Sequence, residues 1–354
     1  MTLDLPTLHF NCSDQLLEQS HVDAAIRTLL ADLEKADYEH LCPTPETQSF
    51  ALAKRQTIAG KDPLTAKTLH DIWGWSLPVS LNTFVFHNLI SRLVPRSYST
   101  FVASNIIMRH LFSLTVRISS LVPFGSYPNY YVHSSWPTSS PDSVFFGPET
   151  YRFIRYLSEA ARRVSECHLA IDVCSGAGAG AFQLAKSFPS ATIFGLDINP
   201  KAVHIADVNR QHLFPDRSQS SPIQIAVSDG FLGVLEHVRG RVDVTSINPP
   251  FIAGDKRTYA AGGPTGMELI LRIIGEAREA LRVNGVLVGH MAAPIGFGGV
   301  DRFRRALDAM SDHWTIVAYD VLDVDIFGEE MASPDNYPDI ARLSSVGIVL
   351  EKKA

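Results

Sequence analysis

The sequence has little cysteine and lacks any long apolar run. Its four cysteines, Cys12, Cys42, Cys167 and Cys174, are scattered along 354 residues without the paired spacing of a zinc or iron–sulfur site. We therefore expect reduced, mostly buried cysteines and no metal. No apolar stretch reaches the length that spans a bilayer, and residues 1–5 lack the basic and apolar pattern of a secretory signal. The expected location is the cytoplasm, with no membrane partner.

Positive charge is also in short supply. The chain has 31 lysines and arginines against 37 aspartates and glutamates, a formal net charge of -6. Binding to a phosphate backbone usually needs a basic face, so a nucleic-acid partner is less expected than a protein or a small molecule. Internal repeats and long low-complexity tracts are lacking too. The length is sufficient for a large core and suggests two domains.

Residues 1–140 differ in pattern from the rest of the chain. Apolar residues suit helices in three segments, 22–33, 65–75 and 81–93. Between 114 and 132 β-branched and aromatic residues dominate, interrupted by proline and glycine, which predicts a β-hairpin. A Ser- and Pro-rich linker follows at 134–143. We expect residues 1–140 to be an accessory, substrate-recognition domain, mainly helical with a β-hairpin near its end.

Residues 141–354 alternate between short apolar strands and helical segments. Strands are expected near 168–173, 191–196, 222–227, 242–247, 284–291, 313–320 and 343–351. Helices are expected between them near 178–188, 200–212, 230–238, 266–282 and 299–311. Such alternation predicts an α/β fold with a doubly wound sheet.

The connection expected at 321–340 is much longer than a tight hairpin. Its acidic residues include Asp323, Asp325, Glu329 and Glu330. These side chains could gate a site, attract a cationic substrate or simply be solvated, and the sequence does not decide between these readings.

Three short motifs follow the first, second and fourth of these strands. Leu169–Val173 leads into a glycine-rich turn, where glycine permits positive φ and lets a ligand approach the main chain. The second strand ends in Asp197, an acid of the kind that accepts hydrogen bonds from ribose hydroxyls. The fourth strand is followed by Asn248-Pro249-Pro250-Phe251. A dinucleotide site would share the first two motifs, whereas the third has no role in ordinary hydride transfer.

Together these residues resemble the class I S-adenosylmethionine-dependent methyltransferases, and within them the HemK-like (release-factor glutamine methyltransferase) type. Val144-Phe145-Phe146-Gly147-Pro148-Glu149-Thr150 is similar to the family's Pro-Asp/Glu-Thr segment ahead of the methyltransferase domain. Gly262-Gly263-Pro264-Thr265-Gly266-Met267 is similar to its glycine-rich lead into the helix before the fifth strand. Two positions depart from the family pattern: Cys174 replaces its usual first glycine, and Thr265 its usual Asp.

The resemblance covers roughly residues 142–320 and implies the fold and the cofactor. The fold would be a Rossmann-like seven-stranded sheet in the order 3-2-1-4-5-7-6 with the last strand antiparallel, forming a methyltransferase domain at 141–354. S-adenosyl-L-methionine would be the cofactor. Its implied ligands are Asp172, Cys174, Gly176, Gly178, Asp197, Ile198, Asp229 and Asn248. Asp197 would hold the ribose, the glycine-rich turn the methionine part, and Asp229 the adenine.

Each of these assignments has a structural alternative. Asp197 could cap the helix that begins at Pro200, the glycines could form a bare turn, and Asp229 could be a helix N-cap.

The catalytic residues expected from the resemblance are Asn248, Pro249, Pro250 and Phe251. Methyl transfer needs a nitrogen lone pair aimed at the methyl carbon and no strong base. Accepting the two N–H groups of an amide or aromatic amine on the Asn248 side-chain oxygen and the Pro249 carbonyl would hold that nitrogen and spread its developing positive charge. The proline pair stiffens the turn, and Phe251 offers a flat apolar face without a phenol hydroxyl. Two oxygen acceptors disfavour a carboxylate nucleophile.

Phe146, Pro148 and Glu149, together with Phe251, are the expected substrate-binding residues, closing over the cofactor or lining the acceptor entrance. An N-cap at Thr150 for a helix over 151–163 is an equal alternative for that segment.

His290, at the end of the fifth strand, is expected to be packed rather than catalytic.

The predicted activity is methyl transfer to a nitrogen, and the acceptor stays open. It is a glutamine or other amide of a protein, a small molecule methylated on N or S in a specialised pathway, or the amino group of a flipped-out nucleic-acid base stacked on Phe251. A module that binds the cofactor without catalysis is disfavoured, because such a protein would not need the acceptor pair of Asn248 and Pro249.

Overall fold

The computed structural model describes residues 13–61, 68, 70–75, 116–121, 129–134, 138, 140–215, 222–254, 259–331 and 337–354. The helix predicted over 81–93 lies outside these residues. Among the residues that are described, no helix is both long and apolar enough to cross a membrane.

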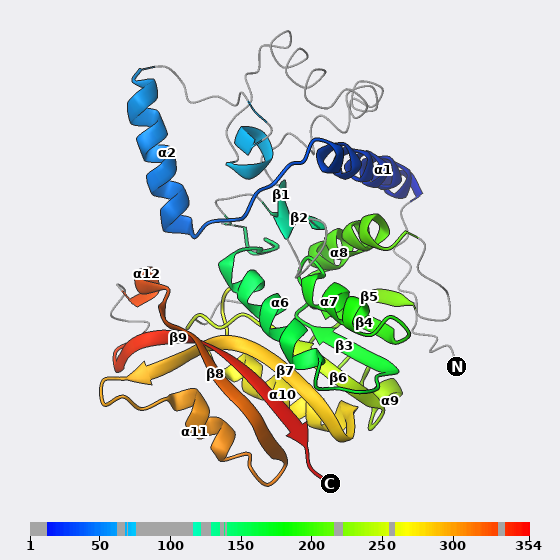
Figure 1. Ribbon diagram of the computed structural model, residues 1–354, viewed down its shortest axis with the longest axis vertical. Helices are drawn as coiled ribbons and strands as arrows, with labels where there is room; N and C mark the ends of the chain where they lie inside the picture. Colours follow the sequence, from blue (N-terminus) through cyan, green and yellow to red (C-terminus); the bar gives the residue numbers. More distant parts are fainter. Residues whose placement is uncertain are drawn as a thin grey trace.

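Seven strands form one sheet in the order β5-β4-β3-β6-β7-β9-β8, seen in Figure 1 below the N-terminal elements. The strands are β3 (Leu169–Val173), β4 (Thr192–Asp197), β5 (Ile223–Val227), β6 (Val242–Ile247), β7 (Leu281–Gly296), β8 (Trp314–Ile326) and β9 (Ile340–Lys352). Counted from β3, this is the order 3-2-1-4-5-7-6; β3 to β7 are parallel, and β9 runs antiparallel to both its neighbours. The predicted Rossmann-like class I methyltransferase fold is confirmed.

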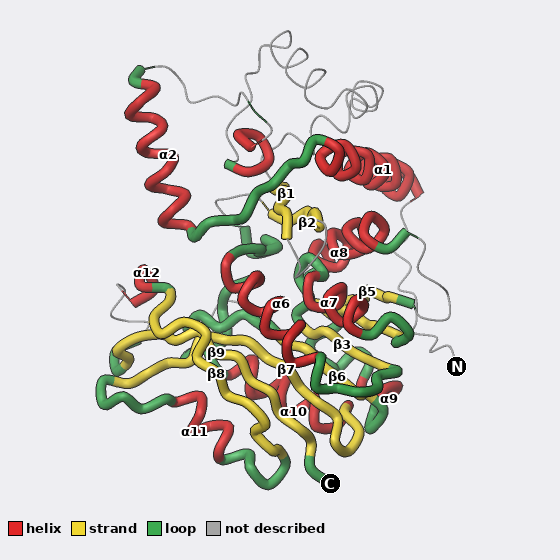
Figure 2. Tube along the Cα trace, in the orientation of Figure 1, coloured by secondary structure: helices red, strands yellow, loops and turns green. Residues whose placement is uncertain are grey.

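Helices cover both faces of this sheet (Figure 2). One face carries α6 (Pro148–Ala161), α7 (Ala179–Ser187) and α8 (Pro200–Leu213), and the other carries α9 (Leu235–Val238), α10 (Glu268–Ala280) and α11 (Arg302–Asp308). Buried Phe153, Phe182 and Ile205 form part of the first core, and Ile274 and Phe303 part of the second. Because both faces of the central parallel strands are covered, every residue of β3 and β6 is buried, including the polar Asp243, Thr245 and Ser246.

The prediction of one long connection at 321–340 is wrong in its first part. Strand β8 continues to Ile326, which pairs with Leu343 of β9, and a short helix, α12 (Gly328–Met331), follows. The acids of this segment do not mark a loop. β8 is an edge strand, where polar side chains at exposed positions are ordinary.

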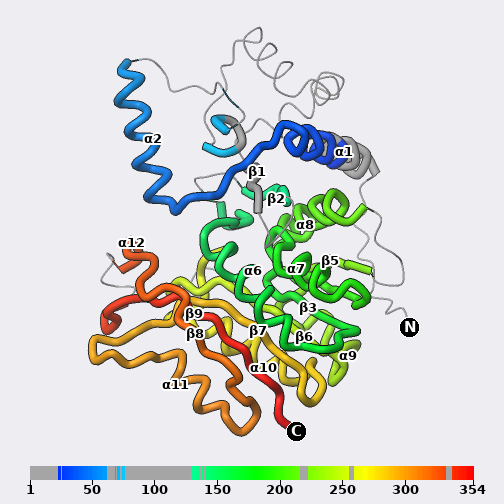
Figure 3. Tube along the Cα trace, viewed as in Figure 1, coloured from blue at the N-terminus to red at the C-terminus, as the bar shows by residue number. Residues whose placement is uncertain are grey.

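The N-terminal residues supply α1 (Ser13–Lys35), α2 (Pro45–Ala59), a π-helical turn (His70–Gly74) and the strands β1 (Val116–Leu121) and β2 (Asn129–Ser134). The strands β1 and β2 pair antiparallel, as the predicted β-hairpin requires. Figure 3 shows α1 beside α8, and buried Leu29 and Leu30 share the core that contains Val208 of α8.

Asn209 of α8 fixes the hairpin to the methyltransferase sheet. Its side chain accepts from the backbone N–H of Val132 at 2.9 Å and donates to the carbonyls of Val132 and Ala177 at 3.1 and 3.0 Å. Ala177 belongs to the glycine-rich turn after β3, so strand β2 is bonded to that turn through one side chain.

Gly347 of β9 leaves the space that α6 needs to pack on the sheet. A Cβ at this position would lie 2.6 Å from Cζ of Tyr156, whose hydroxyl donates to Asp320 at 2.8 Å. We expect Gly347→Ala to lower the free energy of unfolding by about 1–3 kcal/mol, measured by urea denaturation. The matched control is Gly275→Ala in α10, where a Cβ would meet nothing within 4 Å; it should stabilise by about 0.5–1 kcal/mol. Equal effects of the two alanines would contradict this packing.

Candidate functional site

A cavity of about 640 Å³ lies at the carboxyl ends of β3, β4 and β6. Ligands of open α/β sheets bind at this edge. The residues predicted from sequence that line it are Phe146, Glu149, Asp172, Cys174, Gly176, Asp197, Ile198, Asp229, Asn248, Pro249, Pro250 and Phe251. Pro148 and Gly178 are not on its wall: Pro148 is the first residue of α6, and Gly178 is the N-cap of α7.

The turn after β3 depends on left-handed backbone conformations. Cys174, Gly176 and Gly178 have φ values of 60°, 54° and 92°, which glycine adopts without steric cost. Cys174 therefore takes a conformation that explains why a glycine is usual there. A Cβ at Gly178 would lie 2.4 Å from Cζ of Phe182, whereas one at Gly176 would meet nothing within 4 Å. Gly178 thus lets the turn pack closely on α7, and Gly176 leaves room beside the cavity.

Asp197 presents a carboxylate at the end of β4. Its Oδ2 accepts from the backbone N–H of Gly176 at 2.8 Å, and its Oδ1 accepts from that of Asn199 at 2.9 Å. Burial raises the pKa of Asp197. The cap of α8 is Asn199, whose side chain accepts from the N–H of Lys201, so Asp197 is not the capping residue. Each carboxylate oxygen keeps a lone pair for a ligand in the cavity.

Asp172 joins the first turn of α7 to β6. Its carboxylate accepts from the backbone N–H of Ala181 at 3.0 Å and from the hydroxyl of Ser246 at 2.6 Å. Gly180 makes this possible, since a Cβ there would lie 2.2 Å from Oδ1 of Asp172. Burial raises the pKa of Asp172 to about 6.

The raised pKa of Asp172 predicts a pH-dependent stability. Because its folded-state pKa of about 6 lies above its ordinary value of 3.8, the stability contributed by this carboxyl group is full below pH 3.8 and is lost as the pH rises through 6. Asp172→Asn cannot ionise, so its free energy of unfolding relative to wild type should rise by about 2 kcal/mol between pH 4 and pH 7. Urea denaturation of both proteins across this range measures the difference. A constant difference would show that Asp172 does not titrate there.

The Asn-Pro-Pro-Phe motif packs against the glycine-rich segment that precedes α10, and both line the cavity. A Cβ at Gly262 would lie 2.6 Å from the Pro250 carbonyl oxygen, and one at Gly266 only 2.4 Å from the carbonyl oxygen of Phe251. The N–H of Gly262 donates to the carbonyl of Ile252 at 2.8 Å. The glycines of this second motif therefore permit a close backbone contact that supports the first.

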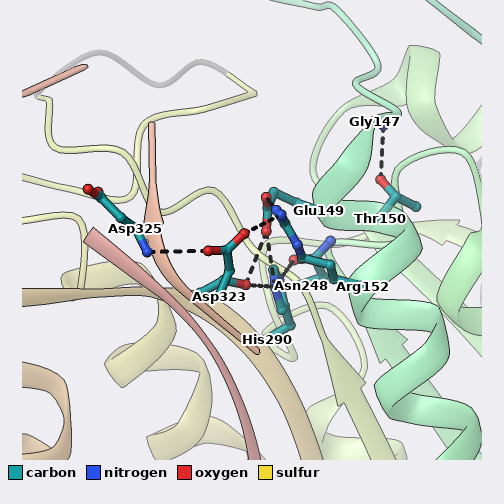
Figure 4. Close-up of polar contacts among 9 residues, drawn as sticks. Gly147, Glu149, Thr150, Arg152, Asn248, His290, Asp323 and Asp325 are labelled. Carbon is teal, nitrogen blue, oxygen red and sulfur yellow. Dashed lines mark hydrogen bonds and ion pairs between the residues drawn. The ribbon is translucent and has the colours of Figure 1, made fainter. Parts of the chain in front are cut away.

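Asn248 belongs to a buried polar network that the sequence did not reveal (Figure 4). Its side-chain oxygen lies 2.9 Å from Nδ1 of His290, and Nε2 of His290 lies 2.8 Å from the Ser345 hydroxyl and 3.2 Å from Oε2 of Glu149. His290 is fully buried, as its packed environment was predicted to be. No sequence motif joins these residues, which come from α6, β7, β9 and the segment after β6.

Glu149 also pairs with Arg152, which reaches Asp323 of β8 at 2.6 Å. Burial raises the pKa of Glu149, but its contacts with His290 and Arg152 outweigh this and hold that pKa below its ordinary value. The N-cap alternative at Thr150 is wrong, because α6 begins at Pro148, and the Thr150 hydroxyl instead accepts from the N–H of Gly147 at 3.3 Å.

The cavity wall is strongly acidic. Asp229 at its rim pairs with Arg272 at 2.6 Å, and Arg272 is the one basic residue among the described residues of the wall. The N-cap alternative for Asp229 is also wrong, since α9 begins at Leu235. Of the acids singled out in the 321–340 segment, Glu329 and Glu330 line the cavity, whereas Asp323 and Asp325 do not.

Comparison with known proteins agrees with this arrangement. Residues 154–294 match the family model of the methyltransferase small domain. The ribosomal protein uL3 glutamine methyltransferase of Burkholderia pseudomallei is 32% identical over 154 residues, covering 37% of this chain and 48% of the relative. The release factor glutamine methyltransferase of Koribacter versatilis is 30% identical over 159 residues, covering 41% and 54%. The predicted resemblance to HemK-like class I methyltransferases is confirmed.

A solved structure, a geranyl diphosphate methyltransferase in complex with GPP and sinefungin, matches with a TM-score of 0.41 and 15% identity over 56% of this chain and 77% of that one. The chain spans about half the length of the first curated relatives it matches.

Proposed function

We propose, from the methyltransferase small domain at residues 154–294 and its glutamine methyltransferase relatives, that this chain transfers a methyl group from S-adenosylmethionine to a side-chain amide nitrogen. One observation carries the proposal. Asn248 and Pro249, an amide acceptor and a fixed carbonyl, line the same cavity as the strand-end carboxylate of Asp197. The end of the cavity around Asp197 suits a nucleoside, and the end around Asn248 and Pro249 suits a group that donates N–H hydrogen bonds.

The cavity fits S-adenosylmethionine. Its volume of about 640 Å³ lies within the range of small-molecule sites, and Gly176 leaves open space where a side chain would stand. We assign the ribose hydroxyls to Asp197, the adenine to the wall between Ile198 and Asp229, and the methionine part to the turn at Cys174 and Gly176. The acidic wall complements the positive charge of a sulfonium and an ammonium group.

In the proposed reaction, this chain mainly positions the acceptor amide against the methyl group. S-adenosylmethionine, when bound, supplies an electrophilic methyl group on a sulfonium. The side-chain oxygen of Asn248 and the carbonyl of Pro249 accept the two N–H groups of the amide and aim its lone pair at the methyl carbon. A C–N bond forms as the C–S bond breaks, and the nitrogen then loses one proton to solvent. The two oxygens stabilise the positive charge that develops on nitrogen, and buried Phe251 packs against the planar amide.

The acceptor we propose is a glutamine side chain of a protein, the group that the names of both relatives specify. Residues 1–140 would recognise that protein as an accessory domain, and Pro45, the first residue of α2, already lines the cavity. Phe146 and Glu149 would border the acceptor. A nucleic-acid base is disfavoured because Glu329 and Glu330 lie on the wall and would repel a phosphate backbone.

Incubation of the purified chain with methyl-labelled S-adenosylmethionine and purified uL3 or release factor tests the proposal. The expected result is label on one of these proteins, located by mass spectrometry to a glutamine side chain and stable to mild base, as an amide is. Label on a carboxylate or a lysine would overturn the amide assignment. Label on neither protein, together with label on free primary amides, would transfer the proposal to a small-molecule acceptor.

A further inference from the structure

His290 is a buried, hydrogen-bonded residue that the proposed chemistry does not use. It lies next to Asn248, and both of its ring nitrogens have polar neighbours. We infer that His290 is a positioning residue that turns the side-chain oxygen of Asn248 toward the acceptor nitrogen. The inference rests on the proposed methyl transfer. In it, the imidazole ring of His290 determines how the side-chain amide of Asn248 is oriented.

The surroundings of Nε2 place the ring proton on that atom. Oε1 of Glu149 accepts a hydrogen bond from Arg152, and Oε2 lies 3.2 Å from Nε2 of His290. A carboxylate only accepts hydrogen bonds, so Nε2 facing it must donate. The Ser345 hydroxyl donates to Oε2 of Glu149 at 3.3 Å and is thereby left as an acceptor for the same Nε2–H at 2.8 Å.

A neutral imidazole with its proton on Nε2 has only a lone pair on Nδ1. Nδ1 must then accept, and its neighbour is the amide of Asn248, whose oxygen stands 2.9 Å away. A half-turn of the Asn248 amide exchanges oxygen and nitrogen without moving other atoms. The NH₂ group then donates to Nδ1, and the oxygen lies on the opposite side. Since Asn248 lines the cavity and His290 does not, that side faces the acceptor.

Side chains of α6, β9 and the segment after β6 surround the ring. The polar side chains facing His290 are Glu149 of α6, Ser345 of β9 and Asn248, and Phe153 and Phe251 contribute aromatic neighbours. Glu149 is the charged member of this set, and Arg152 already pairs with it.

The ring tautomer can be measured without an acceptor. Long-range ¹H–¹⁵N NMR spectra of the full chain labelled with ¹⁵N-histidine report which ring nitrogen carries the proton, and His290→Asn identifies the signal by its loss. We expect a proton on Nε2 and none on Nδ1 in wild type. In Glu149→Gln the carboxamide oxygen stays on Arg152 and the NH₂ group faces Nε2, so the proton should move to Nδ1. A proton on Nδ1, or on both nitrogens, in wild type would overturn the inference.

Kinetic measurements then test whether the orientation imposed by His290 affects the rate of methyl transfer. His290→Leu and Glu149→Gln should each lower kcat about 10-fold. In His290→Leu, whose site of change lies off the cavity wall, KM for the acceptor and Kd for S-adenosylmethionine should stay within about 2-fold of wild type. His290→Asn, whose side-chain oxygen can stand in for Nδ1, should recover most of kcat. The control is His313→Leu, at an exposed position.

A structural role alone predicts a different pattern, in which His290→Asn is as impaired as His290→Leu or all variants lose thermal stability together. Either outcome, or a normal kcat in His290→Leu, would overturn the inference. If the wild-type chain methylates nothing, the proposed function is wrong. The NMR result would still decide which ring nitrogen of His290 carries the proton.

Discussion

Asp197→Ala should bind S-adenosylmethionine at least about 100-fold more weakly than wild type. Two ribose hydroxyls donating to a buried carboxylate make charge-assisted hydrogen bonds worth about 1.5–3 kcal/mol each, and losing both costs two or more powers of ten in Kd. The alanine also releases the N–H groups of Gly176 and Asn199, which Asp197 accepts. Titration calorimetry with S-adenosylmethionine and with S-adenosylhomocysteine measures the loss.

Two further variants make the Asp197 result specific. Asp197→Asn keeps one acceptor oxygen and loses the charge, so its affinity should lie between those of wild type and alanine. Asp312→Ala removes an exposed aspartate on the turn before β8 and should leave Kd unchanged. If wild type binds neither ligand, the cofactor assignment itself fails. If Asp197→Ala binds as wild type does, the ribose lies elsewhere in the cavity.

Asn248→Ala should lower kcat by about 10²–10³-fold while keeping cofactor affinity within a few-fold of wild type. Removing one preorganised hydrogen-bonding group that acts on a developing charge has this size of effect. The alanine removes the amide that accepts the acceptor nitrogen's N–H, but the cofactor cradle around Asp197 and Gly176 stays intact. Single-turnover rates with labelled S-adenosylmethionine separate the chemical step from binding.

Asn284→Gly is the matched control for loss of an amide. Asn284 is exposed and has φ of 60°, so glycine is accepted there without strain. Its kcat should equal that of wild type. A rate for Asn248→Ala within 10-fold of wild type would mean that the Pro249 carbonyl alone orients the nitrogen. A loss of cofactor binding equal to that of Asp197→Ala would instead assign Asn248 to the cofactor.

Much of the fold was predictable because its signals are local. The apolar run of β3, the glycine turn after it and the acid that ends β4 lie within about thirty residues, and each has a steric or electrostatic cause. Strands β3 and β6 were predicted at 168–173 and 242–247, nearly their true bounds, although β6 includes the buried polar residues Asp243, Thr245 and Ser246. Prediction was poorest at the edge of the sheet, where β8 has one exposed face and its acids suggested a loop.

The contacts in the half of the cavity around Asp197 were predicted better than those in the half around Asn248. Asp197 ends β4 and Gly176 follows β3, which is the neighbouring strand. The hydrogen bond from the Gly176 N–H to Asp197 follows from this adjacency. His290 and Ser345 carry no motif, and their partners Asn248 and Glu149 lie 42 and 196 residues away from them, respectively. Only the packing of α6 across β9 brings these groups together.

By itself the sequence determined the alternation of strands and helices, the glycine turn, the strand-end acid and the Asn-Pro-Pro-Phe turn, because each depends on backbone conformation and periodicity over a few residues. The tertiary structure alone decided that Pro148 and Gly178 lie off the cavity wall, that Glu329 and Glu330 lie on it, and that Asn248 contacts a buried histidine. Hydrogen bonds between distant segments depend on which side chains face each other after the sheet is assembled. That pairing has no period and no local conformational signature in the chain.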